Sequence, residues 1–294
     1  MKVTPLSEAT PRPRTVAVGS FDGVHLGHRE VIAGADTVLT FDPRPMAVTS
    51  PGKEPPLLTT LERKAELLGE LGVEEMVVVS FDADFAQRSA SQFVDEVLVE
   101  RLGASHVRIG SNFGFGHRAQ GRPETLLADE RFETTIVPLF DLAGETVSSS
   151  RIRGLIRAGE VADAARLLGS QFVFEGVVEH GEKRGRELGY PTANLSPAAP
   201  LCTPGQAVYA GRVRLEDGST MRAAINVGLR PMFNSGLGEL IEAYVLDFEG
   251  DLYGQRLSVE FVERLRGEER FDSVESLIEQ MASDVEATRA QIQL

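Results

Sequence analysis

The sequence predicts a parallel α/β domain followed by an antiparallel β domain that ends in a helix. The chain has 294 residues, which is long for one compact domain. Up to about residue 170, apolar runs rich in β-branched residues alternate with amphipathic stretches, a pattern typical of a parallel sheet covered by helices on both faces. Beyond that point, strand-like stretches follow one another closely, which indicates an antiparallel barrel or sandwich. We therefore expect two domains, residues 1–169 and 170–294.

Five buried strands are expected in the first domain. Short runs dominated by Val, Ile and Thr predict them at 15–20, 37–41, 75–80, 106–110 and 134–139. The segment before them, MKVTPLSEATPRPR, contains several Pro and Arg residues and is expected to form a short irregular arm. Ligands bind such sheets at the carboxyl ends of the strands, so the turn after the first of these strands is a candidate site.

Helices are expected between the strands of the first domain. One runs from Thr59 to Leu71 and starts with a Thr59-x-x-Glu62 capping box. Another opens near Ser89, has Gln92 three residues further on, and closes at Gly103. Its buried face is expected to hold Phe93, Val94, Val97 and Leu98.

Two further helical segments flank the β domain. One covers 148–169, and the other is a last helix that starts at an Asp272-x-x-Glu275 cap. The apolar residues of the last helix fall on one stripe, namely Val274, Leu277, Ile278, Met281 and Val285.

Composition limits the function classes. The net charge of −14 argues against a protein whose main partner is nucleic acid. No apolar run approaches the length of a membrane span, and the N-terminal segment lacks the apolar core of a signal peptide. The single cysteine, Cys202, allows no internal disulfide and no multi-thiolate metal site. We expect a cytoplasmic location without membrane or nucleic-acid partners; formation of a homo-oligomer is left open.

The stretch GSFDGVHLGHR, residues 19–29, places two of the five histidines in one glycine-rich turn. Small residues let the backbone approach a ligand closely, and a helix that opens near His28 offers N–H groups suited to phosphate. His25 and His28 can add directed donors. The alternatives are that these histidines cap or pack the helix, or that they bind a metal. A metal is disfavoured because no third histidine or cysteine lies nearby at ligand spacing.

A second glycine-rich stretch, GEKRGRELGYPTANL at 181–195, combines glycines with basic residues. Such a hairpin can surround phosphates with backbone N–H groups and positive charge, although a solvated basic turn is an equally good interpretation. The PTAN segment that follows offers a hydroxyl at Thr192 and a carbonyl at Asn194. Both are hard oxygen ligands of the kind that Mg²⁺ prefers.

These stretches resemble a known family. FDGVHLGHR is similar to the HxGH signature of the nucleotidylyltransferase superfamily, and the longer GSFDGVHLGHR resembles prokaryotic bifunctional riboflavin kinase/FAD synthetases. TFDPRP (40–45), VRIGSNFGFGHRAQG (107–121) and VSSSRIRGLIRAGEVADAARLLG (147–169) follow in the family's order, and PTAN and later stretches extend the resemblance over nearly the whole chain. The resemblance implies a Rossmann-like nucleotidylyltransferase domain followed by a β-barrel riboflavin kinase domain with a C-terminal helix.

The resemblance also implies two reactions: ATP-dependent phosphorylation of riboflavin to FMN in the second domain, and adenylylation of FMN to FAD with release of pyrophosphate in the first. For adenylylation it implies ATP contacts at Gly19, Phe21, Asp22, His25, His28, Ser148, Ser149 and Arg153. His28 would lie nearest the reacting phosphorus, and Pro43 and Asn112 would contact the flavin.

For the kinase reaction the resemblance implies ATP contacts at Gly181, Lys183, Arg186, Thr192 and Asn194. Mg²⁺ would be held by Thr192 and Asn194, and Glu242 would act as the base that removes the proton of the riboflavin 5′-hydroxyl. Arg266 would cover the flavin or the nucleotide.

Several positions depart from the family pattern. Arg44 stands where the family has His, Ser150 and Met232 stand where Thr is usual, and the segment after Arg29 is short, so the first crossover helix is expected to be trimmed. Two alternatives therefore stay open. One is a monofunctional riboflavin kinase with a degenerate N-terminal domain, and the other is a non-catalytic regulator that binds flavin or nucleotide.

Overall fold

The computed structural model describes residues 1–181, 188–232 and 236–294. The chain divides into two compact units, each with its own core. The first consists of Met1–Pro55 and Leu61–Ser148, and the second of Pro56–Thr60 and Ser149–Leu294. The functional boundary near residue 170 stays a prediction.

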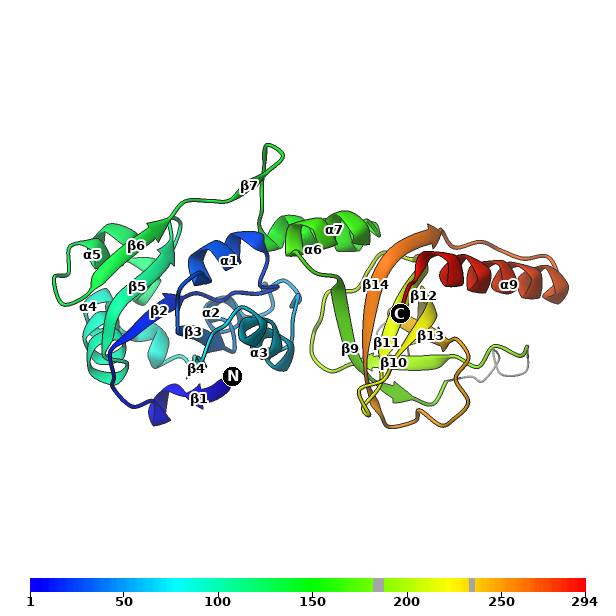
Figure 1. The fold of residues 1–294 in the computed structure, drawn as a ribbon, viewed down its shortest axis with the longest axis horizontal. Coiled ribbons are helices and arrows are strands. Elements are labelled where there is room, and N and C mark those ends of the chain that lie inside the picture. Colours follow the sequence, from blue (N-terminus) through cyan, green and yellow to red (C-terminus); the bar gives the residue numbers. More distant parts are fainter. Residues whose placement is uncertain (182–187, 233–235) are drawn as a thin grey trace. The chain divides into compact units, whose positions relative to one another are not determined.

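The first unit contains a parallel six-stranded sheet in the order β1-β4-β3-β2-β5-β6 (Figure 1). Its strands are β1 (Lys2–Pro5), β2 (Arg14–Val18), β3 (Thr37–Asp42), β4 (Glu75–Ser80), β5 (Ala104–Gly110) and β6 (Glu133–Val137). The five predicted strands are confirmed. The expectation of an irregular N-terminal arm is wrong for Lys2–Pro5, which forms the edge strand of the sheet, pairs with β4 and buries Thr4 against Glu75.

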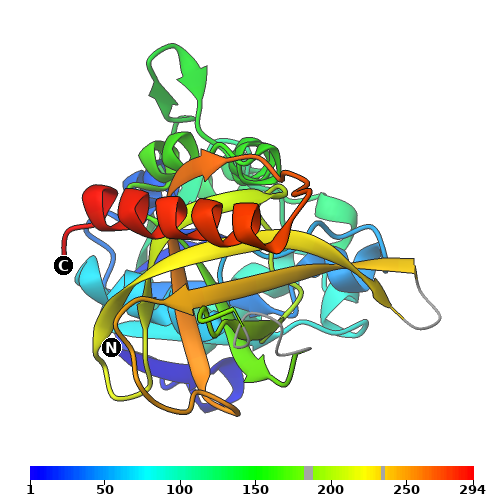
Figure 2. The same ribbon diagram turned by 90° about the vertical axis from the view of Figure 1, so that its right-hand side faces the viewer.

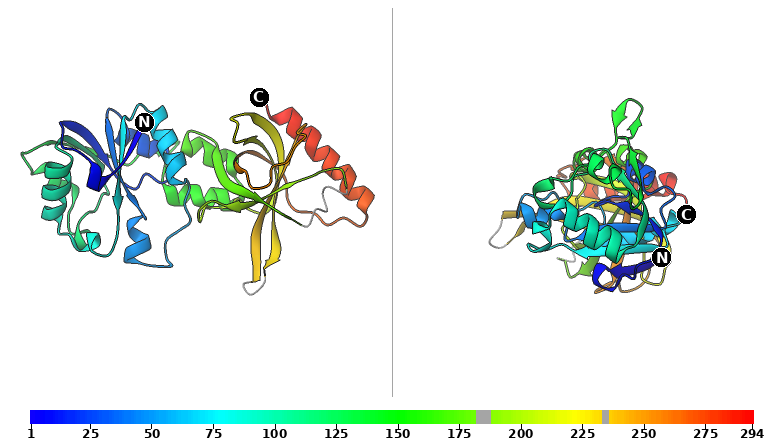
Figure 3. Two further views of the ribbon diagram at one scale, coloured as in Figure 1. Left: turned by 90° about the horizontal axis from the view of Figure 1, so that it is seen from below. Right: turned by 90° about the vertical axis from the view of Figure 1, so that its left-hand side faces the viewer.

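Helices cover both faces of this sheet, as predicted (Figures 1 and 3). Val16 and Val18 of β2 pack with Phe93 and Leu98 on one face, whereas Ala17, between them, packs on the other face. The helical elements are α1 (Leu26–Ile32), α2 (Pro45–Thr49), α3 (Leu61–Glu70), α4 (Ala90–Gln92), α5 (Pro123–Leu127), the π-helix η3 (Phe93–Arg101) and the 3₁₀ turns η1 (Leu6–Glu8), η2 (Phe85–Gln87) and η4 (His117–Ala119). A small hairpin is formed by β7 (Asp141–Leu142) and β8 (Glu145–Thr146).

The predicted helix boundaries hold to within about two residues. The Ser89–Gln92 capping box is confirmed, with both of its hydrogen bonds present, and the helix it starts continues into η3 and ends before Gly103. The helix predicted from Thr59 begins later, at Leu61. The trimmed first crossover helix is also found, because α1 has only seven residues.

The second unit opens with two helices where one helical segment was predicted. These are α6 (Ser149–Ala158) and α7 (Val161–Leu168), and Gly159 separates them in a left-handed conformation with φ +82°. A Cβ at this position would also lie 2.8 Å from the Tyr209 hydroxyl. Only glycine combines this conformation with so close an approach.

The strands of the second unit form a closed antiparallel barrel (Figure 2). Of the two predicted alternatives, barrel and sandwich, the barrel is confirmed. The order is β10-β13-β12-β11-β14-β9. The strands are β9 (Phe172–Glu179), β10 (Ala193–Pro197), β11 (Ala207–Arg214), β12 (Thr220–Met232), β13 (Gly236–Val245) and β14 (Arg256–Arg266). Phe172, Tyr209 and Phe261 are fully buried, and the ring of Phe261 contacts the other two.

The last helix, α9 (Val274–Gln291), packs against β11, β12 and β14. Ser273 caps it together with Ser276, so the predicted Asp272 cap is wrong by one residue. The first residue of the predicted stripe, Val274, is 55% exposed, and the other four are half-buried. Arg266 donates three hydrogen bonds to the buried Asp284 of α9, and its predicted place over the flavin or the nucleotide stays a prediction.

No helix in the described part of the chain combines the length and the apolar character needed to cross a bilayer.

Candidate active sites

The predicted phosphate-binding turn lies at the carboxyl end of β2, near the middle of the sheet. α1 starts at Leu26, and the side chain of His25 caps it, with Nδ1 accepting a hydrogen bond from the His28 N–H at 3.2 Å. The two imidazoles are stacked with their centroids 3.5 Å apart. His25 is buried and His28 is half-buried. The capping interpretation therefore holds for His25, and the structure brings both rings together at the start of one helix.

The backbone of this turn is strained. Phe21 and Val24 have φ values of +46° and +42°, and for a β-branched residue such a value is an outlier that costs on the order of 1–3 kcal/mol. The Phe21 ring lies over Gly19, where a Cβ would be only 3.0 Å from it, and meets the His28 ring edge-on. Gly19 and Phe21 thus shape the turn, while their predicted contacts with ATP stay predictions.

Asp22, in the same turn, is buried and paired with Arg44. The Arg44 guanidinium lies 2.9 Å from Asp22 Oδ2 and also donates to the Pro55 carbonyl. Arg44, one of the positions that depart from the expected pattern, is therefore a cation that neutralises a buried carboxylate.

A residue that the sequence analysis did not select lies beneath the turn. Lys64 of α3 is only 4% exposed, and its Nζ donates to the Ser20 carbonyl at 2.8 Å and to Thr40 Oγ1 at 3.3 Å. Burial lowers the pKa of Lys64 to about 8, against the opposing attraction of Asp22 and Asp42. A sequence signal existed, because Lys64 shares the helix stripe of Leu61 and Leu68.

The other residues predicted for adenylylation lie in several places. Pro43 and Asn112 are exposed and follow the carboxyl ends of β3 and β5. Ser148 is the last residue of the first unit, whereas Ser149 and Arg153 belong to α6 in the second unit. Arg153 is buried, and its Nε donates to the Pro56 carbonyl at 2.7 Å.

The predicted kinase residues converge on neighbouring barrel strands. Asn194 of β10 lies opposite Glu242 of β13, and Glu242 in turn lies opposite Asn226 of β12. Paired residues of antiparallel strands project to the same face, so these three side chains form one polar row. Asn226 Nδ2 lies 3.5 Å from Glu242 Oε2. Asn226 was not selected from the sequence, because only the strand register brings it beside the predicted base.

Gly181 belongs to the same site. A Cβ on Gly181 would lie 2.6 Å from Cγ of the Asn194 side chain, so glycine here lets the chain pass directly over that amide. Thr192 is half-buried immediately before β10. Lys183 and Arg186 lie outside the described residues, and so does the side chain of Met232.

The oxygen atoms of Thr192 and Asn194 suit a magnesium ion whose remaining ligands are phosphate and water oxygens. Within the described residues, no group of three or more His, Cys, Asp or Glu side chains could form a protein cage for a metal. Mg²⁺ is usually bound by one or two protein oxygen ligands together with phosphates and water. The hydroxyl of Thr192 and the carbonyl of Asn194 fit that limited role.

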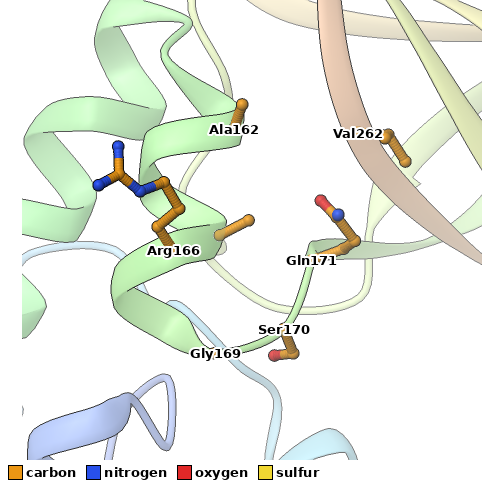
Figure 4. Close-up of a pocket in the computed structure, with 7 residues that line it drawn as sticks. Ala162, Arg166, Gly169, Ser170, Gln171 and Val262 are labelled. Carbon is orange, nitrogen blue, oxygen red and sulfur yellow. The ribbon is translucent and has the colours of Figure 1, made fainter. Parts of the chain in front are cut away.

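A surface depression of about 460 Å³ lies elsewhere on the second unit, between α7 and β14 (Figure 4). Arg166, Ser170, Gln171 and Val262 are among the residues that line it. The Gln171 Oε1 atom is buried and has no hydrogen-bond partner among the described residues. None of the residues predicted for either reaction lines this depression.

Comparison with known proteins gives two family matches and many full-length relatives. The FAD synthetase family model matches residues 7–151, and the riboflavin kinase family model matches residues 168–292. A bifunctional riboflavin kinase/FMN adenylyltransferase of Listeria monocytogenes is 39% identical over 96% of this chain and 94% of the relative. The protein of the same description from Escherichia coli strain K12 is 33% identical over 95% of this chain and 93% of its own length.

The fold has a solved counterpart. A crystal structure from Streptococcus pneumoniae, described as that of a macrolide-efflux protein, matches with a TM-score of 0.88 and 30% identity. The match covers 98% of this chain and 99% of that chain.

Proposed function

We propose, on the premise that this chain belongs to the family of bifunctional riboflavin kinase/FMN adenylyltransferases, that its two reactions depend on His28 and Glu242. The chain phosphorylates riboflavin to FMN and adenylylates FMN to FAD, and riboflavin, FMN and ATP are its substrates. What we propose is the assignment of residues to these reactions. The observation that carries it is that each predicted pair, His25 with His28 and Asn194 with Glu242, is adjacent in the structure.

In adenylyl transfer, a phosphate oxygen of FMN attacks the α-phosphorus of ATP, and pyrophosphate leaves with the electron pair of the broken P–O bond. The nucleophile is already an anion, so the site needs no base. It needs alignment of the reactants and stabilisation of negative charge. The imidazole of His28, at the start of α1, would donate to the phosphate oxygens, and the ring of His25 would hold His28 in place. Ser148, Ser149 and Arg153 would bind the leaving pyrophosphate, and Pro43 and Asn112 would contact the flavin.

In the kinase reaction the nucleophile is a neutral alcohol and needs a base. The Glu242 carboxylate would accept the proton of the riboflavin 5′-hydroxyl while the oxygen attacks the γ-phosphorus and ADP leaves. Thr192 and Asn194 would hold Mg²⁺, which when bound neutralises charge on the phosphates. Gly181, beside the Asn194 amide, would let the chain approach the nucleotide closely, and Lys183 and Arg186 would add positive charge.

The test is a chromatographic time course of flavin products from riboflavin and ATP. His28→Ala should accumulate FMN without FAD, because only adenylylation loses its donor. Glu242→Ala should form no FMN from riboflavin but should still convert added FMN to FAD. Glu263→Ala, which changes an exposed glutamate of β14, is the matched control and should form both products. Omission of Mg²⁺ should stop FMN formation in the wild type.

The outcomes separate the alternatives. A wild type that stops at FMN would support the monofunctional kinase with a degenerate N-terminal domain, and tight flavin binding without turnover would support the non-catalytic regulator. If either variant lost both activities while folded, the assignment to two separate sites would be wrong. We also expect a cytoplasmic location, where ATP is available, and no nucleic-acid partner, given the net charge of −14.

A further inference from the structure

Lys64 is a buried cation for which the reactions above assign no role. Its Nζ and the hydroxyl of Thr40 both donate to one acceptor, the Ser20 carbonyl, at 2.8 and 3.2 Å. Ser20 is the first residue after Gly19 in the phosphate-binding turn, and Thr40 is itself fully buried. A buried lysine is unfavourable unless its ammonium has partners, and here the partners belong to the turn and to the strand next to it.

The backbone of the turn is strained and needs such support. The positive φ values of Phe21 and Val24 persist only where neighbouring groups fix the backbone. Lys64 and Thr40 fix the turn at Ser20, and the Arg29 Nε donor fixes it at the Val24 carbonyl, at 3.2 Å. The residue after Val24 is His25, whose ring is stacked on His28. The position of Ser20 is thus coupled to both imidazoles through the four residues 21–24, two of which are strained.

Lys64 also sets the charge beneath the site. The charged groups that act on it are Asp22, Asp42 and Arg44. With Lys64 protonated, these four side chains carry two positive and two negative charges. Without that proton the cluster has a net negative charge directly under a turn proposed to bind triphosphate, which carries several negative charges itself. A nearby negative charge of this kind repels a phosphate ligand.

We propose that Lys64 is a positioning residue for adenylyl transfer, which holds the strained turn 20–24 through the Ser20 carbonyl and balances the negative charges of Asp22 and Asp42 beneath the proposed triphosphate site. This inference rests on the proposed role of the turn as the ATP site. Lys64 acts through the turn and through its charge.

The test replaces Lys64 with an uncharged side chain of similar length. For Lys64→Met we expect the kcat of FAD formation from FMN to fall at least tenfold and the KM for ATP to rise several-fold. FMN formation from riboflavin should be unchanged, and the melting temperature should not fall, because Met needs no hydrogen-bond partner. Lys53→Met makes the same substitution at an exposed lysine of the same unit and should leave both constants within twofold of the wild type.

A second variant separates the hydrogen bond from the charge. Thr40→Val removes the other donor to the Ser20 carbonyl without a change in charge, so it should lower kcat by less than Lys64→Met and leave the KM for ATP unchanged. Unchanged kcat in either Lys64→Met or Thr40→Val would overturn the proposal. A loss of activity that is matched by a fall in melting temperature would also overturn it, because Lys64 would then be merely structural.

His28→Ala, measured in the same assay, distinguishes failure of the proposed ATP site from failure of the proposed role of Lys64. If His28→Ala keeps wild-type FAD formation, the proposed ATP site itself is wrong. If His28→Ala loses activity and Lys64→Met keeps it, only the role of Lys64 is wrong.

Discussion

The burial of Lys64 makes the stability of the first unit depend on pH in a predictable direction. Burial lowers the pKa of Lys64 from 10.5 to about 8, so in this range the unfolded chain binds more protons than the folded one. Stability should therefore rise as the pH increases from about 8 toward 10.5. Each pKa unit corresponds to about 1.4 kcal/mol. At neutral pH, the lowered pKa of Lys64 therefore reduces the free energy of unfolding by about 3 kcal/mol.

The comparison of wild type with Lys64→Met isolates this contribution, because the other titrating groups cancel in the difference. From pH 7 to pH 9 the wild type should gain about 1 kcal/mol of unfolding free energy relative to the variant. Hydrogen exchange of the β2 and β3 amides in urea measures this, since it reports on the first unit alone. If the difference in unfolding free energy between wild type and Lys64→Met does not change with pH, or changes in the opposite direction, Lys64 is not a buried cation.

Three further predictions concern stability. Gly211→Ala would drive a Cβ into the Glu260 carbonyl of β14, and because that backbone cannot move without breaking the β11–β14 pairing, the barrel should lose about 1–3 kcal/mol or more. Gly154→Ala, on α6 with open space around it, should instead gain up to about 1 kcal/mol, and equal melting temperatures for the two variants would contradict this account. Ser89→Ala removes the capping-box acceptor and should cost about 1 kcal/mol, seen as faster hydrogen exchange in α4; unchanged exchange would show that the cap contributes nothing.

The sequence predicted the elements whose signal is local. Five strands were found because each is a run of β-branched residues, and the Ser89 capping box was found because both partners lie within four residues. β1 was missed because it is an edge strand in which only Thr4 is buried, so its pattern is weak. The break at Gly159 was missed because the need for glycine there comes partly from the close approach of the Tyr209 hydroxyl, which lies 50 residues further along the chain.

The sites show the same division. His25 and His28 are three residues apart, so their proximity could be predicted, whereas Asn226 meets Glu242 only through the register of β12 and β13. Lys64 was not predicted as a site residue because its acceptor, the Ser20 carbonyl, lies 44 residues away in the sequence. That acceptor is a backbone atom, so no side-chain motif indicates the contact. The roles of the individual residues in catalysis stay predictions.

The short segment Pro56–Thr60 has a practical consequence for anyone dissecting this protein. It belongs to the second unit, although the residues on either side of it belong to the first. The chain therefore passes between the units three times, at residues 55/56, 60/61 and 148/149. Thr60 donates to the buried carboxylate of Glu175, and Pro56 offers its carbonyl to Arg153. A truncated protein that begins at Ser149 would lack both contacts. If the two units were produced as separate polypeptides, residues 56–60 would have to be added to the barrel polypeptide.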